Sequence, residues 1–137
     1  MGSVLAEITL RNGADIILAH KGHITEQNIR SFTVTALVDT GAMTLVISEE
    51  LRKKLGLAVI GTRTVTLAGG SKTSCDVAEP VQICWKDRTS LIRPWVMPDE
   101  EDILLGVIPL EEMDLIVDPI NQMLVGAHGD EMMGMIK

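Results

Sequence analysis

The sequence is poor in aromatic residues, positive charge and long hydrophobic runs, and each shortage excludes a class of protein. Aromatic residues make up 2 % of the 137 residues, and the formal net charge is −7. Base stacking and phosphate binding therefore lack the side chains they need, so we expect no nucleic-acid partner. No apolar run approaches the roughly 18 residues of a membrane span, and the N-terminus has no signal-peptide pattern. We expect a cytoplasmic protein that does not bind membranes.

Cysteine and histidine are also scarce, which bears on redox and metal chemistry. The two cysteines, Cys75 and Cys84, indicate a reducing compartment rather than a disulfide framework. We expect both to be core or half-buried residues. His20 and His23 stand in a polar loop without further ligands, so we expect surface histidines. The acidic run 99–102 is typical of a solvated loop, and we expect no metal and no cofactor.

Apolar residues make up 46 % of the chain, and most of them alternate with polar residues between turn signals, which predicts a mostly β protein. Asn12-Gly13 is a strong signal for a tight hairpin turn, and Gly69-Gly70 marks the tip of another hairpin. Strands are expected over residues 4–10, 14–19, 32–38, 44–47, 62–67, 72–77, 81–85, 90–97, 103–105, 115–117 and 123–125.

One helix is clear in the sequence, over residues 49–55. Ser48 can cap its first turn, and two glutamates suit the positive end of its dipole. Gly56 stands where helices commonly stop. A shorter helix is expected from Pro109 to Met113, because proline suits the first helical position.

The most informative stretch delivers one aspartate from an apolar strand onto a tight turn, Ala36-Leu37-Val38-Asp39-Thr40-Gly41-Ala42. A carboxylate at the end of a buried strand needs hydrogen bonds, a cation or a second carboxyl group that shares its proton. Sharing is the arrangement of aspartic proteases, in which two carboxyl groups hold one proton and activate a water. The tripeptide alone also occurs in ordinary solvated turns, so the rest of the chain decides between these interpretations.

The order of the parts resembles that of the retropepsin-like aspartic proteases (clan AA), and the chain is most similar to their small prokaryotic single-domain type. After the Asp39 turn come a strand and a helix, then the Gly-tipped hairpin. Leu104-Leu105-Gly106 forms an apolar-apolar-Gly turn, and a short helix follows. The stretches that match the prokaryotic type are residues 103–106, 108–111 and 113–119. The resemblance covers about residues 32–125.

The resemblance implies a fold and a site. The fold would be a mostly β, closed-barrel acid-protease half with one clear helix and a β-hairpin flap, forming a single domain over residues 1–137. The implied site residues are the catalytic Asp39, the turn residues Thr40, Gly41 and Ala42, the second-turn residues Leu104, Leu105 and Gly106, and the flap residues Ala68, Gly69, Gly70 and Ser71.

The number of Asp-Thr-Gly motifs in the chain predicts a homodimer. The chemistry needs two carboxyl groups and the chain has one Asp-Thr-Gly, so the second Asp39 would come from an identical chain across a two-fold axis. The function implied is a homodimeric aspartic endopeptidase acting on extended peptide or protein substrates. Two alternatives stay open: a non-catalytic dimeric module that binds a peptide or partner, and a carboxylate metal-binding domain. The terminal segments, including Met132, Met133 and Met135, belong either to the dimer interface or to no fixed structure.

Overall fold

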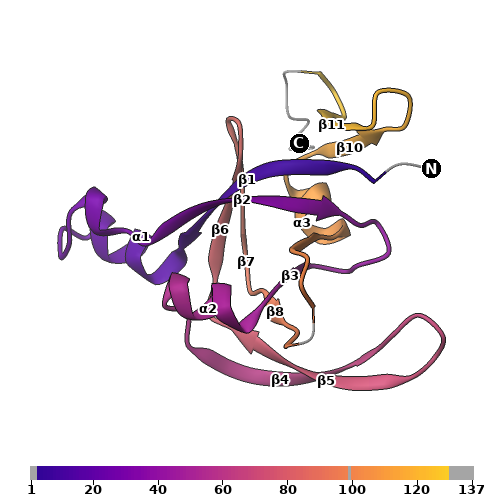
Figure 1. Ribbon diagram of the computed structural model, residues 1–137. Helices are drawn as coiled ribbons and strands as arrows, with labels where there is room; N and C mark the ends of the chain where they lie inside the picture. Colours follow the sequence, from indigo (N-terminus) through magenta and orange to yellow (C-terminus); the bar gives the residue numbers. More distant parts are fainter. Residues whose placement is uncertain (1–2, 99, 130–137) are drawn as a thin grey trace, which may run out of the picture.

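Strands prevail in the computed structural model, which describes residues 3–98 and 100–129 (Figure 1). In these residues nine strands form one sheet, in the order β4-β5-β8-β3-β9-β2-β1-β6-β7, and β10 and β11 form a separate pair. The strands are β1 (Leu5–Asn12), β2 (Ser31–Val38), β3 (Leu45–Ile47), β4 (Val59–Thr66), β5 (Lys72–Ala78), β6 (Val81–Trp85), β7 (Arg88–Ile92), β8 (Trp95–Val96), β9 (Leu104–Leu105), β10 (Leu115–Asp118) and β11 (Met123–Gly126). The helical elements are α1 (Gly13–His20), the 3-10 turn η1 (Glu26–Asn28), α2 (Glu49–Leu55) and α3 (Val107–Glu112).

The large sheet is a curled half-barrel with two edge strands, β4 and β7, where the sequence predicted a closed barrel. Its centre interleaves segments that are far apart in the chain. Strand β2 is antiparallel to β1 and parallel to β9, while β3 is antiparallel to β9 and parallel to β8. This interleaving brings the end of β2, where Asp39 follows, beside the end of β9.

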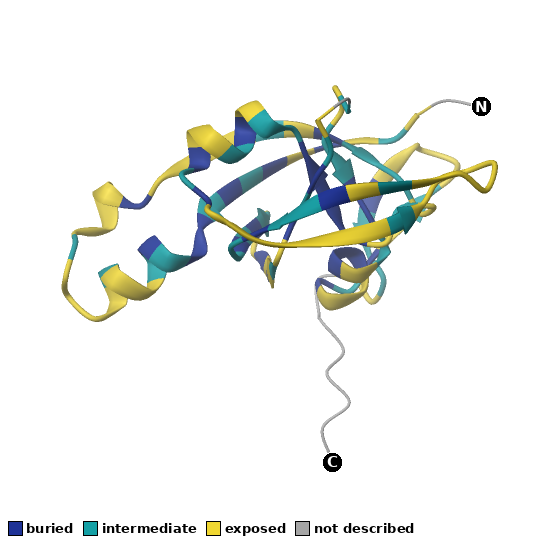
Figure 2. Cartoon of the chain, turned by 90° about the horizontal axis from the view of Figure 1, so that it is seen from below, coloured by how far each residue is buried: buried dark blue, intermediate teal, exposed yellow. Residues whose placement is uncertain are grey.

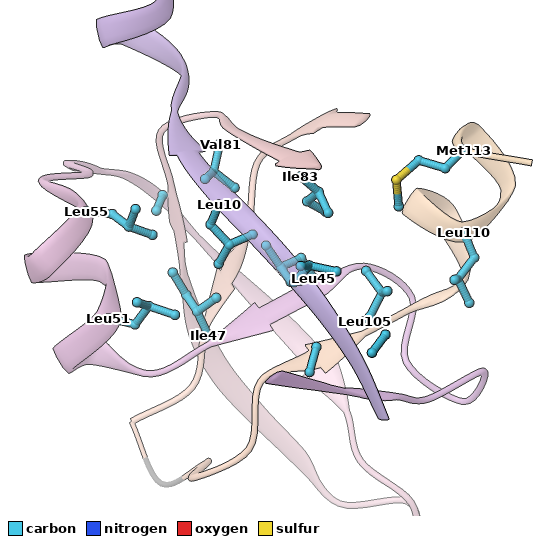
Figure 3. Close-up of a cluster of buried hydrophobic side chains, with 14 of the residues drawn as sticks. Leu10, Leu45, Ile47, Leu51, Leu55, Val81, Ile83, Leu105, Leu110 and Met113 are labelled. Atoms are coloured by element: carbon cyan, nitrogen blue, oxygen red, sulfur yellow. The ribbon is translucent and has the colours of Figure 1, made fainter. Parts of the chain in front are cut away.

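The core fills the inside of the curl (Figure 3). Leu10, Leu45 and Ile47 from the central strands are fully buried there. Leu51 and Leu55 lie on one face of α2 and pack into the same cluster, as the spacing in the sequence predicts. Burying each such side chain contributes about 1.5–3 kcal/mol. The body around the two strand ends is thus held in place by packing, whereas much of the β4–β5 hairpin is exposed (Figure 2).

The segment after Asn12 is a helix, so the prediction of a returning strand over residues 14–19 is wrong. Asn12 does not start a hairpin turn but caps α1: its side-chain Oδ1 accepts a hydrogen bond from the Asp15 N–H at 3.0 Å. Its Nδ2 donates to the Leu55 carbonyl at 2.8 Å. The Gly13 N–H donates to the Pro80 carbonyl. These tertiary bonds favour the helix cap, which asparagine forms as readily as a turn.

Two other element boundaries differ from the predicted ones because of the chemistry of proline. The strand expected over residues 90–97 is divided into β7 and β8 at Pro94, which has no N–H for a strand ladder. Pro109 is the third residue of α3, inside the first turn, where N–H groups have no helical partner.

Helix α2 is capped by Ser48 and ends at Gly56, which has a φ of 69°. Asp99, Met132, Met133 and Met135 lie outside the described residues.

Candidate active site

The Asp39 turn is held by backbone hydrogen bonds at the open end of β2. The Asp39 N–H donates to the Leu105 carbonyl at 3.0 Å, and the Ala42 N–H donates to the Asp39 carbonyl at 3.0 Å. The Gly41 N–H donates to Asp39 Oδ1 at 2.9 Å. Asp39 is half-buried, and Thr40 is exposed beside it. The turn therefore presents a carboxylate, fixed through one oxygen, at the surface of a rigid strand pair.

The second turn, at Gly106, is bonded directly to the segment that leaves Asp39. The Gly106 N–H donates to the Thr44 carbonyl at 3.1 Å, and the Val107 N–H donates to the Ala42 carbonyl at 2.9 Å. A Cβ atom on Gly106 would lie 2.4 Å from the Thr44 oxygen and 2.6 Å from the Ala42 oxygen. Only glycine fits so close a backbone approach. The structure thus brings Leu104, Leu105 and Gly106 against the Asp39 turn.

The tip of the β4–β5 hairpin, residues 68–71, stands away from the body. Gly69 and Gly70 have φ values of 95° and 91°, and nothing lies within 4 Å of a Cβ built on either. The Leu67 N–H donates to the Ser71 carbonyl at 2.7 Å and closes the turn. In Figure 1 the tip and the β2–β3 loop project toward the same side of the view. The structure does not bring Ala68 or its neighbours into contact with Asp39.

A groove of about 650 Å³ begins where the Asp39 turn ends. Met43 and Thr44, which follow that turn, are among its lining residues. The others include residues 60–63, residues 91–93, Trp95, Ile108 and Glu112. We call this space the lateral groove. The sequence does not predict this groove, because its lining residues come from elements that are far apart in the chain and no local pattern shows that they lie together. Volumes of this size are typical of ligand sites.

A second aspartate, Asp15, occupies a closed site at the opposite end of the β1–β2 pair. Its Oδ2 accepts hydrogen bonds from Arg30 Nε at 2.8 Å and from the Arg30 backbone N–H at 3.0 Å, and its Oδ1 accepts from Arg30 Nη2 at 2.9 Å. Arg30 hydrogen bonding holds the pKa of Asp15 below its usual range. This carboxylate is therefore paired within its own chain, through three hydrogen bonds from one arginine.

Other titratable groups offer no competing site. Burial raises the pKa values of the Cys75 and Cys84 thiols, so both disfavour the reactive thiolate. His20 and His23 are exposed. Within residues 3–98 and 100–129, no group of three or more His, Cys, Asp or Glu side chains is placed to hold a metal ion. No helix of this part of the chain combines the length and apolar character needed to cross a bilayer.

Comparison with known families agrees with this geometry. Residues 26–107 match the family model described as aspartyl protease, which covers more than half of the chain. The chain therefore belongs to this family of retropepsin-like aspartyl proteases. The matched region contains the Asp39 turn, the β4–β5 hairpin and the turn at Gly106. A search of curated proteins found no match.

Proposed function

We propose that the protein is a homodimeric aspartic endopeptidase in which the Asp39 carboxyls of two chains form the catalytic pair. The observation that carries the proposal is the clamp between the Asp39 N–H and the Leu105 carbonyl, because it fixes one carboxylate rigidly at an open strand end. Protease function is what membership of the family supports. Residues 1–137 would form one catalytic half.

The mechanism follows from placing two carboxyl groups a few Å apart. Both cannot ionise at low cost, so the pair holds one proton. The ionised Asp39 takes a proton from a bound water, and the water oxygen bonds to the peptide carbonyl carbon. The protonated Asp39 of the other chain donates to the carbonyl oxygen. When the tetrahedral intermediate collapses, the C–N bond breaks and the leaving nitrogen takes a proton from the pair. Activity should rise and then fall with pH.

Support for the dimer comes from apolar residues that are exposed on the first strand and the last hairpin. Leu5 on β1 is 60 % exposed, Ile116 on β10 is 51 % exposed, and Ile120 in the following turn is 89 % exposed. The Val38 N–H donates to the Val4 carbonyl at 2.8 Å, so β1 starts beside the Asp39 end of β2. A second chain that covered these residues would sit next to Asp39, with Thr40 available to its turn.

The substrate would lie extended over Asp39, with the hairpin tip at residues 68–71 closing over it as a flap. The left-handed Gly69 and Gly70 give this tip a backbone that can approach a peptide closely. Backbone hydrogen bonds would supply affinity, and side-chain pockets would supply preference. Met43 and Thr44, which directly follow the active-site turn, would contact residues flanking the cleaved bond.

A subunit-mixing experiment tests this proposal. Wild-type protein and Asp39→Asn are equilibrated in equal amounts, and cleavage of a peptide library is followed at acidic to neutral pH. If each active site needs one Asp39 from each chain, only about a quarter of random dimers keep both, so activity per wild-type chain falls about twofold. Mixing with Asp87→Asn, an exposed turn residue, should cause no such fall, because every dimer then keeps both Asp39 carboxyls. Inert wild-type dimers would instead favour a peptide-binding module, and a monomer would refute the shared site.

A further inference from the structure

The lateral groove is bordered by a strand that lies at the edge of the large sheet. Residues 60–63, which line it, belong to β4, and in the described part of the chain β4 pairs with β5 alone. Within residues 3–98 and 100–129 no side chain bonds to the backbone of β4, whereas on β7 the Leu91 N–H donates to Glu112 Oε1 at 3.1 Å. An edge strand presents backbone N–H and C=O groups with which an extended peptide can pair. An extended peptide is therefore the shape of ligand that this border favours.

Two arginines line the groove, although the chain as a whole carries a net charge of −7. Among the described residues neither Arg63 nor Arg93 forms an ion pair. The Arg63 guanidinium lies over the Trp95 ring, 5.5 Å from its centroid. Of the described residues that line the groove, Glu112 is the one with a negative charge, and its carboxylate already accepts the Leu91 N–H. The groove therefore favours a ligand that supplies carboxylates.

Exposed apolar side chains form the other part of the lining. Ile60, Leu91 and Ile108 line the groove and are 52 %, 55 % and 43 % exposed. Single exposed apolar residues are common on protein surfaces, but several of them around one hollow indicate a binding surface. The ligand should therefore carry apolar side chains as well as carboxylates.

The strand register gives the spacing of the two arginines. Gly61 of β4 pairs with Val77 of β5, and Val77 pairs with Trp95 of β8. Both β4 and β8 are antiparallel to β5, so they run in the same direction. Arg63 follows Gly61 by two residues and Arg93 precedes Trp95 by two, so about 13 Å separates their backbones along the strands. Because the Arg63 guanidinium reaches back over Trp95, an extended ligand would meet both cations with carboxylates two to four residues apart, on one side of its backbone.

The groove also continues from the Asp39 turn. Met43 and Thr44 line the groove and follow this turn directly. Asp39 and Met43 are four residues apart, which is at most about 14 Å of chain. The Thr44 carbonyl accepts the Gly106 N–H at 3.1 Å, so the second turn holds this connection in place. A peptide that lies extended over Asp39 and continues past Met43 therefore enters the groove.

We propose that the lateral groove binds an extended peptide segment that is both acidic and apolar. Its carboxylates would pair with Arg63 and Arg93, and its apolar side chains would contact Ile60, Leu91 and Ile108. In the endopeptidase proposed above, on which this step rests, the segment is the part of the substrate several residues away from the cleaved bond. The preferred substrates would then carry an acidic, apolar stretch beside the cleavage site.

A binding measurement tests the groove without proteolysis. The protein is the full chain with Asp39→Asn, so that the peptides stay intact. The probes are two fluorescein-labelled peptides, Val-Ala-Glu-Val-Glu-Val-Glu-Val and a counterpart with Gln in place of each Glu, and fluorescence anisotropy gives both dissociation constants at about pH 7, where the glutamates are ionised. An arginine variant adds Arg63→Gln and Arg93→Gln. A matched control adds Lys53→Gln and Lys54→Gln, two exposed cations of α2 that do not line the groove.

We expect the acidic peptide to bind about tenfold more tightly than the Gln peptide, a preference that two partly exposed ion pairs allow. The preference should shrink in about 0.5 M salt. The arginine variant should bind both peptides equally, whereas the lysine control should keep the preference. Equal binding of the two peptides before the arginines are changed, or a preference that survives in the arginine variant, would overturn the proposal. An arginine variant that loses dimer mass in sedimentation would also overturn it and assign the groove to a second copy.

Cleavage by the chain with Asp39 intact separates this proposal from the proposed function. Each peptide is joined to either side of a library peptide that the protein cleaves. We expect about tenfold lower KM for the acidic version with nearly unchanged kcat, and no such difference in the arginine variant. Cleavage with equal KM for both versions would overturn the substrate role and leave the protease intact. Acidic preference in binding without cleavage of any library peptide would support the peptide site and refute the proposed function.

Discussion

Asp15 and Asp39 follow the ends of two paired strands, yet the structure treats the two carboxylates in opposite ways. The Asp15 side chain is 7 % exposed and accepts three hydrogen bonds from Arg30. In the described part of the chain, Asp39 accepts one side-chain hydrogen bond, from the Gly41 N–H. One carboxylate is satisfied by its own chain, and the other keeps an oxygen available.

The difference lies in which part of each aspartate the surrounding hydrogen bonds hold in place. Around Asp15, the guanidinium and the backbone N–H of Arg30 bind the carboxylate itself and stabilise its ionised form. Around Asp39, backbone hydrogen bonds to Leu105 and from the second turn hold the main chain and leave the carboxylate accessible. A group positioned by its backbone and not neutralised by its own chain is what general acid–base chemistry needs. The two aspartates can therefore be separated by experiment.

Replacing each aspartate by asparagine gives the largest expected contrast. Asp39→Asn should lower kcat/KM on a cleaved peptide by about 10²–10⁴-fold, the range for loss of an acid–base group. Its melting temperature should stay within about 2 °C of wild type, because among the described residues one hydrogen bond involves the Asp39 side chain. Asp15→Asn should show the reverse, with lower stability and nearly normal kcat/KM. Matching activity losses for both variants would remove the distinction drawn between them.

The glycine clamp behind Asp39 should be the most sensitive structural position. Gly106→Ala places a Cβ 2.4 Å from the Thr44 oxygen, an overlap with backbone that we expect to lower the free energy of unfolding by about 3 kcal/mol. Urea unfolding measures this change. Gly61→Ala is the matched control, because a Cβ there meets nothing within 4 Å. Equal stability of the two variants would show that the turns do not clamp each other.

At the Asp15 end, Asn12→Ala should cost about 2 kcal/mol of unfolding free energy. The substitution removes the cap on the Asp15 N–H and leaves the buried Leu55 carbonyl without its Nδ2 donor. Chemical denaturation measures the loss, and far-UV circular dichroism should show weaker helix signal. Asn28→Ala, at an exposed position in η1, serves as the comparison and should change stability by less than about 0.5 kcal/mol.

The smallest effect concerns pH. Because Arg30 lowers the pKa of Asp15 in the folded protein, the pair contributes stability that is fully present above the unfolded pKa, near 3.8. That contribution is lost as the pH falls through the lower, folded pKa. We therefore expect Asp15→Asn to be about 1 kcal/mol less stable than wild type at pH 7, with the gap narrowing below about pH 4. Unfolding curves from pH 2.5 to 7 would test this, and a gap that widens in acid would contradict it.

The sequence predicted the Asp39 turn and the elements that follow it better than the first helix and the lateral groove. The Asp39 turn, α2 and the hairpin around Gly69 follow local patterns in which propensity, capping and tertiary structure agree. The helix after Asn12 was missed, since Asn-Gly suits both a hairpin and a cap, and only the bonds to Leu55 and Pro80 decide. The lateral groove could not be predicted either, because it depends on how closely the curl of the sheet brings the edge strands β4 and β7 together.

The pairing of β2 with β9 also has a kinetic consequence. Strand β2 is made early in synthesis, but the Leu105 carbonyl that anchors Asp39 and the glycine behind it come much later in the chain. Long-range parallel pairing of this kind is slow to form, because the entropy cost of closing a large loop comes before the stabilising contacts are made. A nascent chain halted before Gly106 would therefore hold its aspartate in an unformed turn, and hydrolytic capacity would appear among the last properties acquired during folding.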